Sequence, residues 1–133
     1  MARYMLDTNM CIYLMKNQPP HVAARFAQCH VGDVVMSAIT FAELEYGVLA
    51  SDNPARHHLH LASLIADIPV AAFDAAAASA YGPIRQASNT GRKDQLDKLI
   101  ASHAVSLGIV LVTNNVRDFE QYRNLMIENW THE

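Results

Sequence analysis

The stretch Tyr4-Met5-Leu6-Asp7-Thr8-Asn9 decides how this sequence folds. Its three apolar residues predict a short buried strand, and the polar residues that follow predict a helix start, because Asp, Thr and Asn side chains cap helices. In open α/β sheets, functional sites lie outside the carboxyl ends of the strands. Asp7 stands at such an end, so it is the first candidate site residue.

The same alternation of strand and helix continues along the chain. Further strands are expected at 34–36, 68–73, 109–112 and near 125–127, and Pro69 makes the 68–73 strand an edge strand or a strand start. Helices are expected at 11–15, 21–28, from Thr40 onward, 54–65, 75–87 and 96–107, the last one stopped by Gly108. This pattern predicts an α/β fold with a central parallel β-sheet covered by α-helices on both faces.

Length and composition favour one globular domain over residues 1–133. Hydrophobic residues make up 51% of the chain and charged residues 17%, which is typical of a protein with a buried core. The net charge of -3 argues against nucleic-acid binding through a general basic surface. Cys11 and Cys29 are too few for a disulfide framework and are expected as free thiols. No signal peptide or membrane-spanning run is seen, so a cytoplasmic protein without membrane association is expected.

Polar residues gather at the predicted strand ends. Asp7 follows the first strand, Glu43 lies at the start of the helix after the second strand, and Asn115 and Asp118 follow the fourth strand. Because the carboxyl ends of parallel strands share one edge of a sheet, these four residues are expected close together. Asp97 begins the helix that leads to the fourth strand, and it joins them if that helix points its N-terminus to the same edge.

Converging carboxylates repel one another unless protons or cations neutralise them. Their oxygens are ligands for Mg²⁺ or Mn²⁺, and two such ions about 3.5–4 Å apart can cleave a phosphodiester. The chain has no His/Cys spacing typical of zinc, and the cluster His57, His58 and His60 is expected on a solvated helix face far from the acids. The acids are therefore a candidate metal centre for phosphodiester hydrolysis.

Each acid also has a structural interpretation, which the sequence leaves open. Asp7 can be the N-cap of the first helix, and Thr40-Phe41-Ala42-Glu43 fits a capping box in which the glutamate bonds backbone N–H groups. Asp97 can be a surface acid favoured by the helix dipole. Asn115 or Asp118 can cap a last short helix.

Several stretches together resemble the PIN-domain proteins, and specifically the VapC-type toxins. They are Met5-Leu6-Asp7-Thr8-Asn9 with Cys11-Ile12-Tyr13, Ser37 to Gly47, Asp97 to Ala104, Val112 to Phe119, and the ending Ile127-Glu128-Asn129-Trp130. The stretches occur in the family's order and cover essentially the whole chain.

The resemblance implies a PIN fold and usually a homodimer. It also implies a Mg²⁺- or Mn²⁺-dependent endoribonuclease that is the toxin of a type II toxin–antitoxin pair. The implied substrate is a tRNA, with initiator tRNA favoured, and its cleavage would inhibit translation. The implied partner is a small VapB-like antitoxin, through which the pair binds operator DNA.

The resemblance also assigns roles to single residues. Asp7 and Asp97 are the expected metal ligands, and Glu43 is a third acid that binds metal directly or through water. Thr113 is expected to orient the ligands through its hydroxyl. Many members have an Asp where this chain has Asn115, so the fourth corner of the site is either Asn115 or Asp118.

Residues around the third motif are further candidates. Asp94 is expected on the same helix face as Asp97, as an accessory acid or without a role. The basic residues expected to contact RNA phosphates, with solvated surface as the alternative, are Arg85, Arg92, Lys93 and Lys98.

Two other functions compete with the nuclease. The departure at Asn115 favours a PIN-like RNA-binding or regulatory module that does not cleave. A metal-dependent phosphatase is the third possibility, although the chain has no Asp-x-Asp nucleophile motif.

Overall fold

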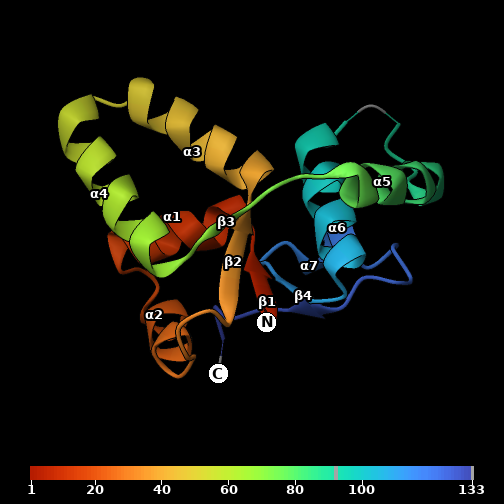
Figure 1. Cartoon of the computed structure of the whole chain (residues 1–133), viewed down its shortest axis with the longest axis horizontal. Coiled ribbons are helices and arrows are strands. Elements are labelled where there is room, and N and C mark those ends of the chain that lie inside the picture. The colour runs from red at the N-terminus through yellow and green to blue at the C-terminus, as the bar shows by residue number, and fades with distance from the viewer. Residues whose placement is uncertain (92, 133) are drawn as a thin grey trace.

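A parallel sheet runs through the middle of the molecule, as seen in a computed structural model that describes residues 1–91 and 93–132 (Figure 1). Its strands are β1 (Tyr4–Leu6), β2 (Val34–Ser37), β3 (Val70–Ala71), β4 (Val110–Val112) and β5 (Ile127–Glu128). Their order across the sheet is β3-β2-β1-β4-β5, and every neighbouring pair is parallel. The predicted parallel α/β architecture is confirmed, and the first stretch of sequence forms the central strand.

Helices connect the strands. They are α1 (Thr8–Lys16), α2 (Pro20–Ala27), α3 (Ala38–Leu49), α4 (Pro54–Asp67), α5 (Ala75–Ala87), α6 (Gln95–Leu107) and α7 (Val116–Phe119). In Figure 1, α1 to α4 lie on one side of the sheet, and α5, α6 and α7 lie on the other.

Alternate strand residues build two separate cores, one on each face of the sheet. Tyr4 and Leu6 belong to the core that includes buried residues of α1 to α4. Met5, between them, belongs to the core that includes Leu111 and buried residues of α5, α6 and α7. Side chains of a strand alternate between its two faces, so this division follows directly from the strand geometry. The expectation that helices cover both faces is confirmed.

The start of α3 differs from the expected one. The helix begins at Ala38, and its N-cap is Ser37, whose Oγ accepts from the Ile39 N–H at 3.0 Å. Thr40 is buried inside the helix and is not a cap. The capping-box interpretation of Thr40 and Glu43 is therefore wrong, and Glu43 lies in the second turn of α3.

At the sheet edges, β3 is shorter than the predicted strand, and β5 starts later in the chain than predicted. Pro69 has no N–H for a strand ladder, and its carbonyl accepts from the Met36 N–H at 3.0 Å at the start of β3. The third strand is therefore only Val70–Ala71, at the sheet edge as the proline predicted. β5 starts at Ile127 and not at Leu125, which lies in the core before the strand begins.

The C-terminus of α6 forms as expected. Gly108 adopts a φ of 67°, in the left-handed region that favours glycine, and its N–H reaches the carbonyls of Ala104 and Val105. The helix ends at Leu107, and Gly108 and Ile109 connect it to β4.

Two features expected from composition also have structural counterparts. Cys11 and Cys29 are free, Cys11 buried and Cys29 half-buried. Among residues 1–91 and 93–132, no helix is both long and apolar enough to cross a bilayer.

Two leucines of α4 provide a matched test of the first core. Leu61 is 1% exposed, whereas Leu59 is 69% exposed on the same helix. We expect Leu61→Ala to lower the free energy of unfolding by about 2–5 kcal/mol, because it removes buried methyl groups and leaves a cavity. Leu59→Ala should change the free energy by less than about 0.5 kcal/mol. Urea unfolding of both variants measures this, and equal losses would contradict the described packing of α4.

Candidate active site

Asp7 leaves the end of β1 and has two tasks. It is 6% exposed, and its Oδ1 accepts from the Met10 N–H at 3.0 Å, which makes it the N-cap of α1. Burial raises the pKa of its carboxyl, while bonds from the Thr113 hydroxyl and the Met10 N–H oppose that rise. The charge of Glu43 raises the same pKa further, so Glu43 lies nearby. Asp7 is thus both a helix cap and a member of an acidic cluster.

Glu43 is held by a side chain of a different helix. The Thr8 hydroxyl, in the first turn of α1, donates to Glu43 Oε1 at 2.6 Å. Thr8 Oγ1 also lies 3.4 Å from Thr40 Oγ1. Sequence reasoning treated Thr8 only as a possible cap. Its position directly after Asp7, at the edge where Glu43 was expected, was the signal that could have identified this contact.

Asp97 joins the cluster from α6. It lies in the first turn of α6 and is half-buried, and the charges of Asp7 and Glu43 act on it, so the N-terminus of this helix lies at the same edge of the sheet. Its pKa is raised to about 6, first by burial and then by the charges of Asp7, Asp94, Glu43 and Asp118. The sequence left open whether Asp97 joins the other acids at this edge, and the structure places it there.

Asn115 and Asp118 are partners at the fourth corner of the site. The Asn115 side-chain amide donates to Asp118 Oδ2 at 2.6 Å. The Asn115 N–H donates to Thr113 Oγ1 at 2.9 Å, and the Thr113 hydroxyl in turn bonds Asp7. The side chain of Asn115 does not cap α7. The asparagine thus fixes the orientation of the carboxylate next to it.

Asp94 lies outside the helical face of Asp97. It is the N-cap residue of α6, with a left-handed φ of 56° and no side-chain cap bond. Even so, Asp94, Asp97 and Asp118 line one hollow of about 20 Å³ together with Phe119 and Tyr122. Asp94, predicted as an accessory acid, reaches the cluster because of the backbone turn before α6 and not because it shares a helix face with Asp97.

The basic residues expected to contact RNA phosphates differ in their exposure. Arg85 and Lys93 are exposed, as phosphate contacts require, and Arg92 lies outside the described residues. Lys98 is 1% exposed, and its ammonium group donates to the Gly91 carbonyl. The prediction that Lys98 contacts RNA phosphates is wrong, because this face of α6 packs into the protein and the ammonium group has a backbone partner there.

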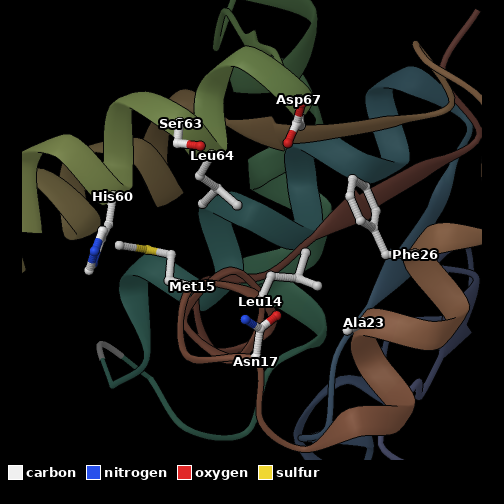
Figure 2. A pocket seen from close by; sticks show the side chains of 9 residues that line it. All are labelled: Leu14, Met15, Asn17, Ala23, Phe26, His60, Ser63, Leu64 and Asp67. Atoms are coloured by element: carbon white, nitrogen blue, oxygen red, sulfur yellow. The ribbon is translucent and has the colours of Figure 1, made fainter.

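The histidines of α4 lie on a mostly exposed face, as predicted, with His58 and His60 exposed and His57 half-buried. His57 and His60 line a groove of about 510 Å³ between α1, α3 and α4, and Glu43 lies on its wall with apolar residues such as Leu44 and Val48. Figure 2 shows a neighbouring hollow of about 280 Å³, where Leu14 and Met15 of α1 face Phe26 of α2 and Leu64 of α4. His60 and Met15 line both hollows.

The donor chemistry of the cluster fits a hard divalent cation. Carboxylate and amide oxygens from four segments meet at one edge, and such oxygen ligands suit Mg²⁺ or Mn²⁺, whereas zinc sites usually include His or Cys. In the part of the chain that the structure describes, no three His, Cys, Asp or Glu side chains converge closely enough to enclose an ion. The arrangement is an open acidic edge, and mutual repulsion of the uncompensated carboxylates favours that openness.

Comparison with known proteins agrees with this fold. The family model described as PIN domain matches residues 4–125. The chain is 40% identical over 133 residues to the tRNA(fMet)-specific endonuclease VapC of Shigella flexneri, covering 98% of this chain and 100% of that protein. It is 37% identical over 132 residues to ribonuclease VapC2 of Haemophilus influenzae, covering 98% and 99%.

Solved structures give the same result. The DNA-bound VapBC structure from Salmonella typhimurium superposes with a TM-score of 0.87 at 39% identity, covering 98% of this chain and 99% of that chain. VapBC-1 from nontypeable Haemophilus influenzae superposes with a TM-score of 0.83 at 37% identity, covering 97% and 98%. This chain belongs to the PIN-domain family. Within that family it is similar along its whole length to the VapC ribonucleases, as the sequence resemblance indicated.

The raised pKa of Asp97 predicts a pH dependence of stability. The usual pKa is 3.8 and the folded value is about 6, so the folded state binds the proton more tightly than the unfolded state. Stability from this group is therefore fully present below about pH 4 and is lost as pH rises through about 6. Asp97→Asn should raise Tm by a few degrees near neutral pH in metal-free buffer, and by little near pH 4.

Thermal unfolding monitored by circular dichroism in EDTA measures this effect. Glu45→Gln removes the same charge from an exposed position on α3 and should show a smaller change without the pH trend. A lower Tm for Asp97→Asn at neutral pH would contradict the unfavourable burial of the Asp97 charge.

Proposed function

We propose that this chain is a Mg²⁺- or Mn²⁺-dependent endoribonuclease that acts as the toxin of a VapBC-type toxin–antitoxin pair. The observation that carries the proposal is that Asp7, Glu43 and Asp97 lie close enough at the carboxyl edge of the sheet that, beyond the effect of burial, the charge of Glu43 raises the pKa of both aspartates. The relatives along the whole chain are endonucleases and ribonucleases by name, which supports the same reaction.

In this proposal Asp7 and Asp97 bind the cation, and Glu43 completes the ligand set directly or through water. A divalent cation bound there would lower the pKa of a water molecule and offset charge on the scissile phosphate. The protein's own contribution is to hold the carboxylates in place. Thr113 bonds Asp7 and Thr8 bonds Glu43, so neutral hydroxyls orient both acids without cancelling their charge.

The fourth corner supports cleavage over a module that only binds RNA. The sequence argument for a non-cleaving module was that Asn115 removes an acid from the site. In the structure, Asn115 holds the carboxylate of Asp118, whose charge acts on Asp97. Asp118, three residues further on, therefore supplies a negative charge that Asn115 cannot.

We propose tRNA as the substrate, with initiator tRNA favoured, so that cleavage inhibits translation. Two relatives are named tRNA(fMet)-specific endonucleases, which supports this choice. The exposed Arg85 and Lys93 would contact RNA phosphates beside the acidic edge, and Arg92 has the same proposed role. A few local contacts of this kind are compatible with a net charge of -3.

We also propose a VapB-like antitoxin as the partner, with operator DNA bound through it. Several solved relatives are VapBC structures, and two of them include DNA. The apolar groove that begins at Glu43 lies next to the acidic edge, so a partner seated there would also cover the site. A homodimer remains a prediction, and the exposed Tyr46 and Leu49 of α3 are available for it.

The central test is Asp7→Asn, which separates the charge of Asp7 from its role as a cap. The amide oxygen can still accept from the Met10 N–H, whereas Asp7→Ala would also lose the cap and about 1 kcal/mol of stability. We expect Asp7→Asn to lower kcat for tRNA cleavage by about a hundredfold or more, with Tm maintained. EDTA should abolish wild-type cleavage, and added Mn²⁺ should restore it.

Asp67→Asn, an exposed position at the end of α4, is the matched control and should cleave normally. The proposal is wrong if Asp7→Asn cleaves like the wild type. A wild-type protein that binds tRNA but never cuts it in Mn²⁺ would identify the non-cleaving module.

A second test concerns Lys93. We expect Lys93→Ala to raise KM for tRNA several-fold and to weaken its salt dependence by about one phosphate contact, with kcat nearly unchanged. Lys16→Ala is the control, because Lys16 is exposed at the end of α1 opposite to Asp7. KM measured across a salt series for both variants checks this. Equal effects of the two variants would show that Lys93 has no specific contact.

A further inference from the structure

A buried hydrogen bond joins two helices that each carry a site acid. Ser37 and His103 are 0% and 1% exposed, and Ser37 Oγ lies 2.7 Å from His103 Nδ1. Ser37 is the N-cap of α3, and His103 lies in the middle of α6. The contact links positions 66 residues apart in the sequence and is not part of the proposed reaction.

The hydrogen positions follow from the partners. Ser37 Oγ already accepts from the Ile39 N–H at 3.0 Å, so the hydroxyl proton is free to donate to His103 Nδ1. The ring also has a hydrogen bond with the backbone of Ala72. Burial lowers the pKa of His103, which keeps the ring neutral and Nδ1 available as an acceptor. The His103 ring also packs against the Phe73 ring in a T-shaped arrangement, with ring centroids 5.3 Å apart.

This bond connects helices that pack mainly into different cores. Leu44 and Val48 of α3 belong to the core on one face of the sheet, whereas Ile100 and Ala104 of α6 belong to the core on the other face. α3 meets the core of α6 through the half-buried Ile39 of its first turn, close to Ser37. Ser37 contacts His103 at the edge of the sheet, between the two cores.

We propose that His103 is a positioning residue that acts through Ser37 to set the separation of Glu43 and Asp97. Glu43 lies six residues after Ser37 on α3, and Asp97 lies six residues before His103 on α6. Without the bond, repulsion between the two carboxylates would be free to move the helices apart. This inference rests on the proposed function, because the separation matters for a cation held between these acids.

The test compares three variants of α6 with the wild type. His103→Leu removes both bonds of the ring and should weaken Mn²⁺ affinity, measured by calorimetry, by about tenfold, as loss of a group that orients metal ligands does. Its kcat should fall by a similar factor while KM for tRNA stays unchanged. His103→Asn supplies an amide oxygen that accepts from Ser37, so it should recover most of the Mn²⁺ affinity.

Ser102→Ala is the matched control for loss of a buried hydrogen bond. Ser102 is fully buried next to His103, but its hydroxyl donates to the Lys98 carbonyl of the same helix at 2.7 Å. It should lower Tm and leave Mn²⁺ affinity unchanged. All measurements are made at a temperature where circular dichroism shows a folded protein.

The outcomes separate the two proposals. If the wild type binds Mn²⁺ and His103→Leu binds it equally well, His103 is only structural and this inference is overturned. The same holds if folded His103→Asn is as weak as His103→Leu. If His103→Leu does not fold, His103→Gln replaces it, since its amide is expected beyond the position of Nδ1 and away from Ser37. A wild type that binds no Mn²⁺ overturns the proposed function itself and this inference with it.

Discussion

Hydrogen bonding of β1 to β2 on one side and to β4 on the other sets the register on which the site depends. Leu6 pairs with Met36 and with Val112. The residues that follow these three, Asp7, Ser37 and Thr113, therefore emerge together at the carboxyl edge of the sheet. A shift of one residue in the β1–β4 pairing would separate Asp7 from Thr113, and the same shift in the β1–β2 pairing would move Ser37 away from Asp7.

Each of the residues at this edge has both a local and a tertiary role. Asp7 caps α1 and contributes a carboxylate, and Ser37 caps α3 and bonds His103. Thr113 accepts from the Asn115 N–H and bonds Asp7. Cap and site are therefore not alternatives in this fold. A helix N-terminus at a strand end orients a side chain outward, and the same backbone amides make a negative charge there less costly.

The carboxylates at the carboxyl edge of the sheet lower the stability of the folded protein near neutral pH. Burial and like charges raise the pKa of Asp97 to about 6, so the folded protein holds an ionised Asp97 at a cost near neutral pH. Hydroxyls of Thr8 and Thr113 orient neighbouring acids, and the buried Lys98 turns to a backbone carbonyl instead. The negative charge of the edge is thus left uncompensated, as the proposed cation site requires.

The sequence by itself determined the element order, the parallel sheet and the edge at which the acids meet. These features depend on periodicity and on residues next to each other in the chain, as in the run from Tyr4 to Asn9. It also indicated the family, because five short stretches that resemble it stand in order. Only the tertiary structure decided that Thr8 binds Glu43, that Asn115 supports Asp118, that Lys98 is buried and that His103 reaches Ser37. Three of these four rest on contacts between different elements or on the side of a helix that faces the core, and the pair at 115 and 118 rests on a turn geometry. Such contacts depend on how helices settle on the sheet, which local patterns of hydrophobicity and capping do not specify.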